Sequence, residues 1–451
     1  MKIKQFKDKN LSHYSYAILS ECEKKIILID PARNPKQYLE YAQEQSATIS
    51  GIIETHPHAD FVSSHLELHQ TTGATIYASQ LVHAFYPHQA FDEGQSITLG
   101  KIELTAINTP GHSPDSICVV LKHDGKQKAA FTGDTLFIGD CGRPDLRPDE
   151  DNAENAAIKL AKQMYHSLRN KLMQLEDETT VYPAHGAGTL CGKALSKANS
   201  STIAKEKESN WSLKQQTEDE FIKELLDDQP FIPAYFAYDV KLNKHGAGNL
   251  IENTSAVHIG DPIINEHTGE RLNKSLWIVD VRDEQDYKKG HLLHSTNLMN
   301  ETKFETWLGS IIKPGEQFYI AASDEKNLKD IIERTAAIGY ETQIKEAFIL
   351  KYYEVKEEKI DVTKFKEHMN DYTIIDVRNT SEAKEKKIFE NSISIPLGDL
   401  RRDASMISLD KPIVVHCSSG YRSAAGSSIL QSQLNGKVKV FDLGDSVKKF
   451  M

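Results

Sequence analysis

The chain has 451 residues, and at about 150 residues per domain this length predicts three domains. Its composition, with 39% hydrophobic and 26% charged residues, is ordinary for a soluble globular protein, and a net charge of −11 makes nucleic acid and anionic membranes unexpected partners. With no apolar signal-peptide core, no apolar run long enough to span a membrane and five scattered cysteines, the protein is expected to be cytoplasmic.

Through the first 200 residues, short apolar runs alternate with loops rich in His, Asp and Gly. The patterns predict helices at 34–46 and 61–73 and strands at 24–30, 50–56, 74–79, 102–109, 116–121, 128–134 and 180–186. Metal-capable residues stand where predicted strands end: His56, His112, Asp134 and His185. Because loops at strand ends commonly carry functional side chains, we expect a site there. A polar segment at 196–228 is expected to be partly helical and to lead into a linker.

The rest of the sequence contains an internal repeat. Residues 275–291 and 371–387 each hold an apolar run that ends in Asp-Val-Arg. At the same spacing after each aspartate stand Ala321 and Cys417, and both follow a strand-like run and precede a helical pattern. Two copies of one α/β domain explain this self-similarity most simply.

The residues at the first strand ends have the chemistry of a metal site. Two histidines and one carboxylate with open positions form the triad that non-haem Fe(II) oxygenases favour, and His56, His112 and Asp134 supply it. Zinc hydrolases more often use three protein ligands and a bound water, so zinc in the same site is the rival prediction. A second metal would need a histidine directly after Asp60, where the chain has Phe61. We therefore predict one metal.

Four motifs in this order, T-H-x-H-x-D, T-x-G-H-S, F-T-G-D-T-L and Y-P-A-H-G, resemble the metallo-β-lactamase superfamily. The expected fold is therefore α/β and multidomain, with an αββα sandwich at the N-terminus followed by two rhodanese-like α/β domains. Within the superfamily, the segment GDTLFIGDCGRPD resembles persulfide dioxygenases, which are relatives of glyoxalase II. That resemblance implies one Fe(II) per chain, with zinc as a misloaded metal.

The resemblance also implies roles for individual residues. The iron ligands would be His56, His112 and Asp134. Three further residues would orient these ligands or hold water: His58, Asp60 and His185. Arg143 would contact the thiol carrier of the substrate. Cys191 follows closely after His185 and is either an accessory thiol that accepts sulfane sulfur or a structural residue.

The stretch HCSSGYRS (416–423) predicts a strand, a tight loop and a helix, with Cys417 opening the loop. The backbone N–H groups of such a loop favour a thiolate or persulfide anion, and Arg422 would lower the thiol pKa. A phosphatase loop is similar but has one more residue between cysteine and arginine. Together with Asp376 and Arg378 the loop resembles a rhodanese, a sulfurtransferase whose Cys417 would carry sulfur. Ala321 replaces that cysteine in the first copy, which we expect to be inactive.

Over nearly its whole length, the chain resembles persulfide dioxygenase–rhodanese fusion proteins. The expected domains are a dioxygenase domain at 1–228, a degenerate rhodanese-like domain at 229–357 and an active rhodanese domain at 358–451. The resemblance implies oxidation of thiol persulfides of the glutathione, coenzyme A or bacillithiol type by O₂ to sulfite, transfer of sulfur to give thiosulfate, and detoxification of sulfide. The alternatives are a glyoxalase-II-like zinc thioesterase with an accessory rhodanese domain, or a sulfur carrier whose first domain only binds. A homo-oligomer is also expected.

Overall fold

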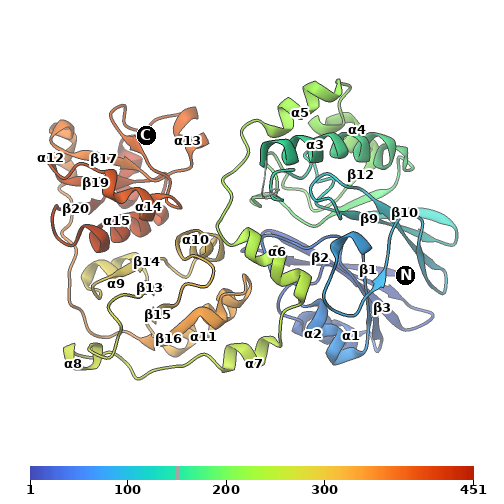
Figure 1. The fold of residues 1–451 in the computed structure, drawn as a ribbon, viewed down its shortest axis with the longest axis horizontal. Coiled ribbons are helices and arrows are strands. Elements are labelled where there is room, and N and C mark those ends of the chain that lie inside the picture. Colours follow the sequence, from blue (N-terminus) through green and yellow to red (C-terminus); the bar gives the residue numbers. More distant parts are fainter. Residues whose placement is uncertain (148–152) are drawn as a thin grey trace. The chain divides into compact units, whose positions relative to one another are not determined.

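The computed structural model describes residues 1–147 and 153–451 (Figure 1). These residues form two compact units, Met1–Leu250 with Ala337–Gly339 and Ile251–Ala336 with Tyr340–Met451. The first unit holds two six-stranded sheets and the second holds two four-stranded sheets. Among the described residues, no helix is both long and apolar enough for a membrane span.

The first sheet of the first unit is built in chain order, β1-β2-β3-β4-β5-β6. The three N-terminal strands pair antiparallel, and the strands from β3 onward pair parallel. Its strands are β1 (Lys2–Asp8), β2 (His13–Ser20), β3 (Lys25–Ile29), β4 (Thr48–Ile53), β5 (Thr75–Ala78) and β6 (Gln89–Ala90). Two helices connect the parallel strands: α1 (Lys36–Glu44) and α2 (His65–Thr72).

The second sheet has the order β12-β11-β10-β9-β8-β7 and is mostly antiparallel. Its strands are β7 (Ser96–Leu99), β8 (Ile102–Asn108), β9 (Ile117–His123), β10 (Lys126–Gly133), β11 (Thr180–Pro183) and β12 (Ser201–Thr202). The helices that follow are α3 (Ala153–Asn170), α4 (Ile203–Ser209) and α5 (Glu218–Leu226). In α3, residues Leu160, Ala161, Met164 and Leu168 recur at helical spacing and are buried.

Three apolar clusters join these elements into layers. One cluster lies between the two sheets, where Ile18 and Ile27 of the first sheet meet Leu104 and Val119 of the second. A second cluster packs α1 and α2 against the outer face of the first sheet. A third packs α3, α4 and α5 against the second sheet, as Figure 1 also shows. The predicted αββα sandwich is thereby confirmed.

The second unit contains two sheets of the same topology. Their orders are β14-β13-β15-β16 and β18-β17-β19-β20, and all pairings are parallel. The strands of the first are β13 (Trp277–Asp280), β14 (Ser295–Asn297), β15 (Phe318–Ala322) and β16 (Ile344–Ile349). Those of the second are β17 (Thr373–Asp376), β18 (Ile393–Ser394), β19 (Ile413–His416) and β20 (Val440–Asp442). The internal repeat in the sequence therefore corresponds to a repeated fold.

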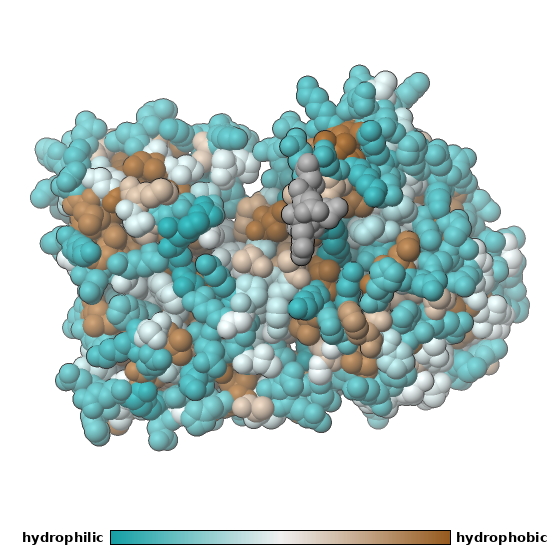
Figure 2. Space-filling model, in the orientation of Figure 1, coloured by the Kyte–Doolittle hydropathy of each residue, from teal (hydrophilic) through white to brown (hydrophobic). Residues whose placement is uncertain are grey.

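Helices surround these two sheets. Around the first lie α7 (Leu250–Ser255), α8 (Glu266–Gly269), α9 (Glu284–Lys289), α10 (Phe304–Ile311) and α11 (Glu325–Ala336). Around the second lie α12 (Val362–Glu367), α13 (Thr380–Glu385), α14 (Leu400–Asp403) and α15 (Tyr421–Leu434). On the face drawn in Figure 2, hydrophilic residues predominate and apolar residues form scattered patches.

The first unit extends past the domain boundary that we expected at residue 228. Helix α6 (Phe236–His245) belongs to it, as does the chain up to Leu250. The segment that the sequence suggested as a linker is thus followed at once by a helix of the first unit, and this helix contacts the candidate metal site.

Candidate functional site

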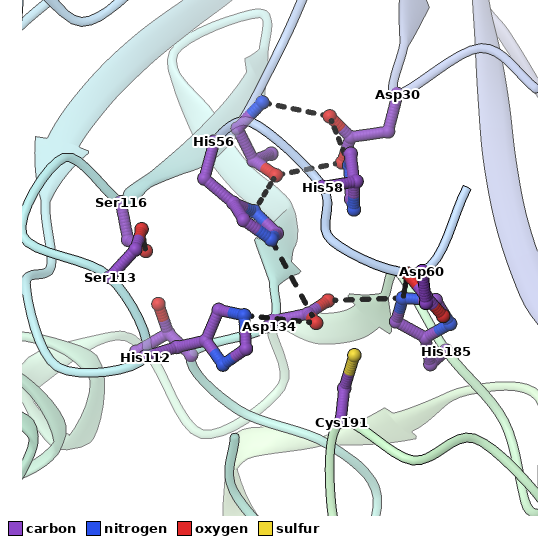
Figure 3. Close-up of polar contacts among 12 residues, drawn as sticks. Asp30, His56, His58, Asp60, His112, Ser113, Ser116, Asp134, His185 and Cys191 are labelled. Atoms are coloured by element: carbon purple, nitrogen blue, oxygen red, sulfur yellow. Dashed lines mark hydrogen bonds and ion pairs between the residues drawn. The ribbon is translucent and has the colours of Figure 1, made fainter. Parts of the chain in front are cut away.

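Three side chains from three strand ends meet inside the first unit. His56 follows β4, His112 follows β8 and Asp134 comes directly after β10. The Oδ2 atom of Asp134 lies 3.5 Å from Nε2 of His112 and 3.8 Å from Nε2 of His56. Figure 3 shows both imidazoles on one side of Asp134, with Asp60 and His185 on the other. The structure therefore brings together the triad that the sequence predicts.

The far side of each imidazole is held by the protein. Nδ1 of His112 lies 2.8 Å from the Arg143 carbonyl oxygen, which fixes the ring and directs Nε2 toward Asp134. Nδ1 of His56 lies 3.1 Å from the Thr55 hydroxyl, and that hydroxyl donates to Asp30 at 2.9 Å. Among the described residues, Nε2 of His56 and both carboxylate oxygens of Asp134 have no hydrogen-bond partner. Buried polar atoms without partners at this spacing fit a metal ion.

The electrostatic environment also suits a cation. Burial is the main cause that lowers the pKa of His56 and of His112 well below the usual value, so both imidazoles are neutral and able to coordinate. Burial also raises the pKa of Asp134. A bound cation would offset this penalty by stabilising the ionised carboxylate. The triad therefore has the donor set and the charge of a metal centre.

A second cluster lies beside the triad and contains His58, Asp60 and His185. Nε2 of His185 lies 3.5 Å from a carboxylate oxygen of Asp60 and 3.5 Å from one of Asp134. Burial lowers the pKa of His58, but the Asp30 carboxylate at 3.3 Å outweighs it and raises that pKa to about 9. His58 therefore lies in two groups of possible ligands, one with Asp60 and His185 and one with Asp30 and Glu54.

Phe61 borders this second cluster. Its buried ring lies 4.3 Å from the His58 ring and 3.8 Å from the His13 ring, measured between centroids. His13, at the start of β2, is buried as well, and its Nε2 has no partner among the described residues. Sequence reasoning missed His13, because no metal motif surrounds it.

Arg143, the predicted substrate contact, is 1% exposed and is paired inside the protein. Nε and Nη2 donate to the Asp145 carboxylate at 2.6 and 2.7 Å, and Nη1 donates to the Leu190 carbonyl at 3.1 Å. Its own carbonyl holds His112. These contacts assign Arg143 to the support of the metal loop, and its contact with a substrate stays a prediction.

Cys191 is buried next to the triad. Its Sγ, a carboxylate oxygen of Asp134 and an imidazole nitrogen of His185 all lie within 4.8 Å of one another. Burial, followed by the charges of Asp60 and Asp134, raises the pKa of the Cys191 thiol well above its usual value. The side chain is therefore a neutral thiol in this setting. Its position next to the triad leaves both predictions open, an accessory thiol and a structural residue.

The metal loop is held by a side chain that the sequence did not point to. Asn243, on α6, donates from Nδ2 to the carbonyls of His58 and Phe61, both at 2.8 Å. Its Oδ1 accepts from the Ser63 amide at 2.8 Å. Tyr235 adds a hydrogen bond to the Asp60 carbonyl at 3.2 Å. Four backbone groups of the loop are thus fixed by residues beyond the expected end of the domain.

In the second unit, Cys417 lies where β19 ends and α15 begins. Its Sγ accepts from the Gly420 amide at 3.1 Å, and Gly420 has a φ of 105°, which a glycine adopts readily. Arg422 donates to both carboxylate oxygens of Glu382, one at 2.8 Å, and to the Ser418 hydroxyl at 3.1 Å. The buried cysteine and the predicted loop are present, but the guanidinium is paired with Glu382.

Asp376 and Arg378 pair with each other. Nε of Arg378 lies 2.9 Å from Oδ1 of Asp376, and Nη2 lies 2.6 Å from Oδ2. In the first copy, Asp280 and Arg282 make the same contacts at 2.9 and 2.6 Å. Because the pair recurs in a copy without the cysteine, its geometry favours a structural role, and a catalytic role for Asp376 and Arg378 stays a prediction.

The loop of the first copy carries its own anion. Asp324 accepts from the Asn327 amide at 2.9 Å and from the Ser323 hydroxyl at 2.8 Å. Ala321, at the position of the cysteine, is buried. An internal carboxylate thus uses donors that an anionic substrate would need.

Comparisons with known proteins agree with this architecture. Residues 10–185 match the Metallo-beta-lactamase superfamily, and residues 361–451 match the Rhodanese-like domain. A crystal structure of a metallo-beta-lactamase from Staphylococcus aureus subsp. aureus COL is similar, with a TM-score of 0.68 and 28% identity. The similarity covers 77% of this chain and 99% of that one. The N-terminal metallo-beta-lactamase domain is thus followed by a rhodanese-like domain.

Two kinds of curated relatives match the first unit about equally. A hydroxyacylglutathione hydrolase from Pseudoalteromonas translucida is 32% identical over 184 residues, and the mitochondrial persulfide dioxygenase ETHE1 from Mus musculus is 30% identical over 174. The matches cover 41% and 38% of this chain, and 63% of the length of each relative. The relatives that match the first unit thus carry two different activities in their names.

Proposed function

We propose that this chain, in which a metallo-beta-lactamase domain precedes a rhodanese-like domain, is a non-haem Fe(II) persulfide dioxygenase joined to a sulfurtransferase. The observation that carries the proposal is the group of candidate metal ligands His56, His112 and Asp134, with the apolar ring of Phe61 nearby. Two neutral imidazoles and one carboxylate are the donor set that mononuclear Fe(II) oxygenases favour. The relative named as a persulfide dioxygenase supports a persulfide substrate.

The residues around the triad support one metal instead of two. His58 is paired with Asp30, and Phe61 stands where a second metal would take an imidazole. Asp60 and His185 remain to hold water or to accept protons beside the metal. The chain's own contribution is therefore to orient two imidazoles, hold His58 next to Asp30 and line one side of the site with an apolar ring.

Iron held by His56, His112 and Asp134 would supply the redox chemistry of the reaction and would bring the persulfide and O₂ together. The overall reaction converts RSSH, O₂ and H₂O to RSH, sulfite and two protons. Cleavage of the S–S bond returns the thiol, and the terminal sulfur is oxidised. The buried, neutral Cys191 lies next to this site.

The rhodanese-like domain would use the product of the first reaction. A persulfide on Cys417 transfers its outer sulfur to sulfite, which yields thiosulfate and releases the Cys417 thiolate. The Gly420 amide at 3.1 Å from Sγ is placed to stabilise negative charge on sulfur. Arg422 must share its donors between Glu382 and the incoming anion.

A glyoxalase-II-like zinc thioesterase is the second candidate. The relative named as a hydroxyacylglutathione hydrolase, at 32% identity, favours it. In this case the same triad would hold zinc and activate water for attack on a thioester. Phe61 disfavours this reading, because it removes an imidazole from the place of a second metal.

Oxygen uptake by the anaerobically Fe(II)-loaded protein tests the proposal directly. Addition of glutathione persulfide should consume O₂ and release sulfite, and His56→Ala should lose both the bound iron and the uptake. The same protein loaded with zinc should be inactive toward persulfide. Hydrolysis of a glutathione thioester by the zinc form, without O₂ uptake by the iron form, would replace the proposal with the second candidate.

A further inference from the structure

One buried arginine next to the metal site has donors that the protein does not use. Nη2 of Arg147 donates to the carbonyl of Pro57, the residue between the two histidines of the metal loop. Nε and Nη1 are buried and have no hydrogen-bond partner within 1–147 and 153–451. Leaving the donors of a charged group buried and unpaired is costly, so such groups in native structures call for an explanation.

The contrast with Arg143 in the same segment is direct. Arg143 is clamped by two hydrogen bonds to Asp145 and one to the Leu190 carbonyl. Within 1–147 and 153–451, the guanidinium of Arg147 makes one hydrogen bond, to the Pro57 carbonyl, and no ion pair with a carboxylate. The segment thus contains one arginine that supports the loop and one that is positioned but unpaired.

Arg147 lies next to the metal loop. Its contact with the Pro57 carbonyl places the guanidinium next to the loop that carries His56 and His58. Asp115, Cys191 and Asp134 act on Arg147, although burial still lowers its pKa. The Asp115 carboxylate is already engaged, because it accepts from the Ser113 hydroxyl at 2.6 Å and lies 4.0 Å from Nζ of Lys244. The guanidinium therefore lies within electrostatic reach of both imidazole ligands without a carboxylate of its own.

We infer that Arg147 is a substrate-binding residue, and that its partner is a carboxylate of the low-molecular-weight thiol that carries the persulfide. This inference rests on the proposed function for the identity of the substrate. A guanidinium is planar, always charged and rich in donors, and its strongest partners are carboxylates and phosphates. A carboxylate at Nε and Nη1 would satisfy the unpaired donors and place the sulfur end of the thiol toward the triad. Arg147 would thereby take the role that the sequence suggested for Arg143.

Binding of glutathione and of glutathione diethyl ester tests the assignment, because the ester keeps the thiol but lacks both carboxylates. Isothermal titration calorimetry with Zn(II)-loaded protein measures both ligands without turnover. The wild type should bind glutathione at least about tenfold more tightly than the ester, in line with a charge-assisted hydrogen bond. Arg147→Gln should abolish this difference, and Arg147→Lys should restore part of it. Lys122→Gln, which removes an exposed charge on β9, should change neither affinity.

Each other outcome overturns the assignment. If the wild type binds both ligands equally or binds neither, a carboxylate is not what Arg147 recognises. If Arg147→Gln weakens both ligands equally, the guanidinium interacts with the sulfur end instead. Metal content and circular dichroism show whether Arg147→Gln has lost its fold. If it has, the affinity difference between glutathione and the ester is measured in Arg147→Lys instead, and its absence there overturns the assignment. Because binding is measured without O₂, a protein that fails as a dioxygenase still gives a readable result.

Discussion

The ring of Phe61 lies 3.8 Å from the ring of His13, and both side chains are buried within the first unit. Phe61 directly follows Asp60 in the metal loop, and its ring also lies 4.3 Å from that of His58. An apolar ring thus stands where a second metal would need an imidazole. We therefore expect the number of bound metals to depend on the residue at position 61.

An imidazole at position 61 should allow a second metal ion to bind. Phe61→His places a ligand beside Asp60 and His185, so we expect bound Zn(II) to rise from about one to about two per chain. Metal analysis after loading and gel filtration measures the ratio. Phe61→Leu keeps the position apolar and should stay at about one. A histidine variant that still binds one metal would show that some other feature excludes the second.

Removing the amide of Asn243 should loosen the metal loop. Asn243→Ala deletes three hydrogen bonds of 2.8 Å to the loop backbone, so the free energy of unfolding of the first unit should fall by about 3 kcal/mol. Urea denaturation measures this change, and iron retention should fall with it. Asn170→Ala removes an exposed asparagine and should change stability by less than about 0.5 kcal/mol. Equal effects of the two variants would contradict the role of Asn243.

The dioxygenase activity and the sulfurtransferase activity should be separable by mutation. Cys417→Ser should reduce thiosulfate formation by at least about a hundredfold and leave persulfide-dependent O₂ uptake unchanged, because a hydroxyl does not carry sulfane sulfur. Ion chromatography of thiosulfate and an oxygen electrode measure the two activities. Cys118→Ser, at a buried cysteine of the second sheet of the first unit, serves as the control. Loss of both activities in Cys417→Ser would mean that the reactions are obligatorily linked.

The stability of the second unit should fall with rising pH because of Glu357. Burial and the Asp442 carboxylate raise the pKa of Glu357 from 4.5 to about 7, against the opposing charge of Lys288. Between these values the folded state holds a proton that the unfolded state has lost, so stability decreases as pH rises through the window and stays lower above it. Relative to Glu357→Gln, which does not titrate, the wild type should lose about 3 kcal/mol between pH 4.5 and pH 8.

Urea denaturation of the second unit at both pH values checks this expectation. Glu358→Gln is the matched control, since Glu358 is the exposed neighbour and pairs with the exposed Lys439. It should follow the wild type at both pH values. If Glu357→Gln also follows the wild type, then Glu357 is ionised in the folded protein across the whole range.

Some of the site could be read from local pattern. His56, His112 and Asp134 each stand at or just after the end of a predicted strand, and the spacing of hydrophobic residues along the chain indicates those strand ends. Cys417 likewise stands between a strand pattern and a helix pattern, and the repeated Asp-Val-Arg segments predicted two copies of one fold. These features depend on neighbouring residues, so the sequence alone determined them.

Other features depend on which distant segments meet, and only the tertiary structure decided them. Asn243 holds a loop about 180 residues earlier in the chain, and His13, at the start of β2, packs on Phe61 of that loop. Arg143 and Arg147 look alike in sequence, yet Arg143 is clamped by Asp145 and Leu190 while Arg147 keeps two donors unpaired. The spacing of hydrophobic residues predicts which side of a helix or strand is buried. The hydrogen-bond partners of a buried polar group depend on how whole elements pack together, and no local sequence pattern predicts that packing.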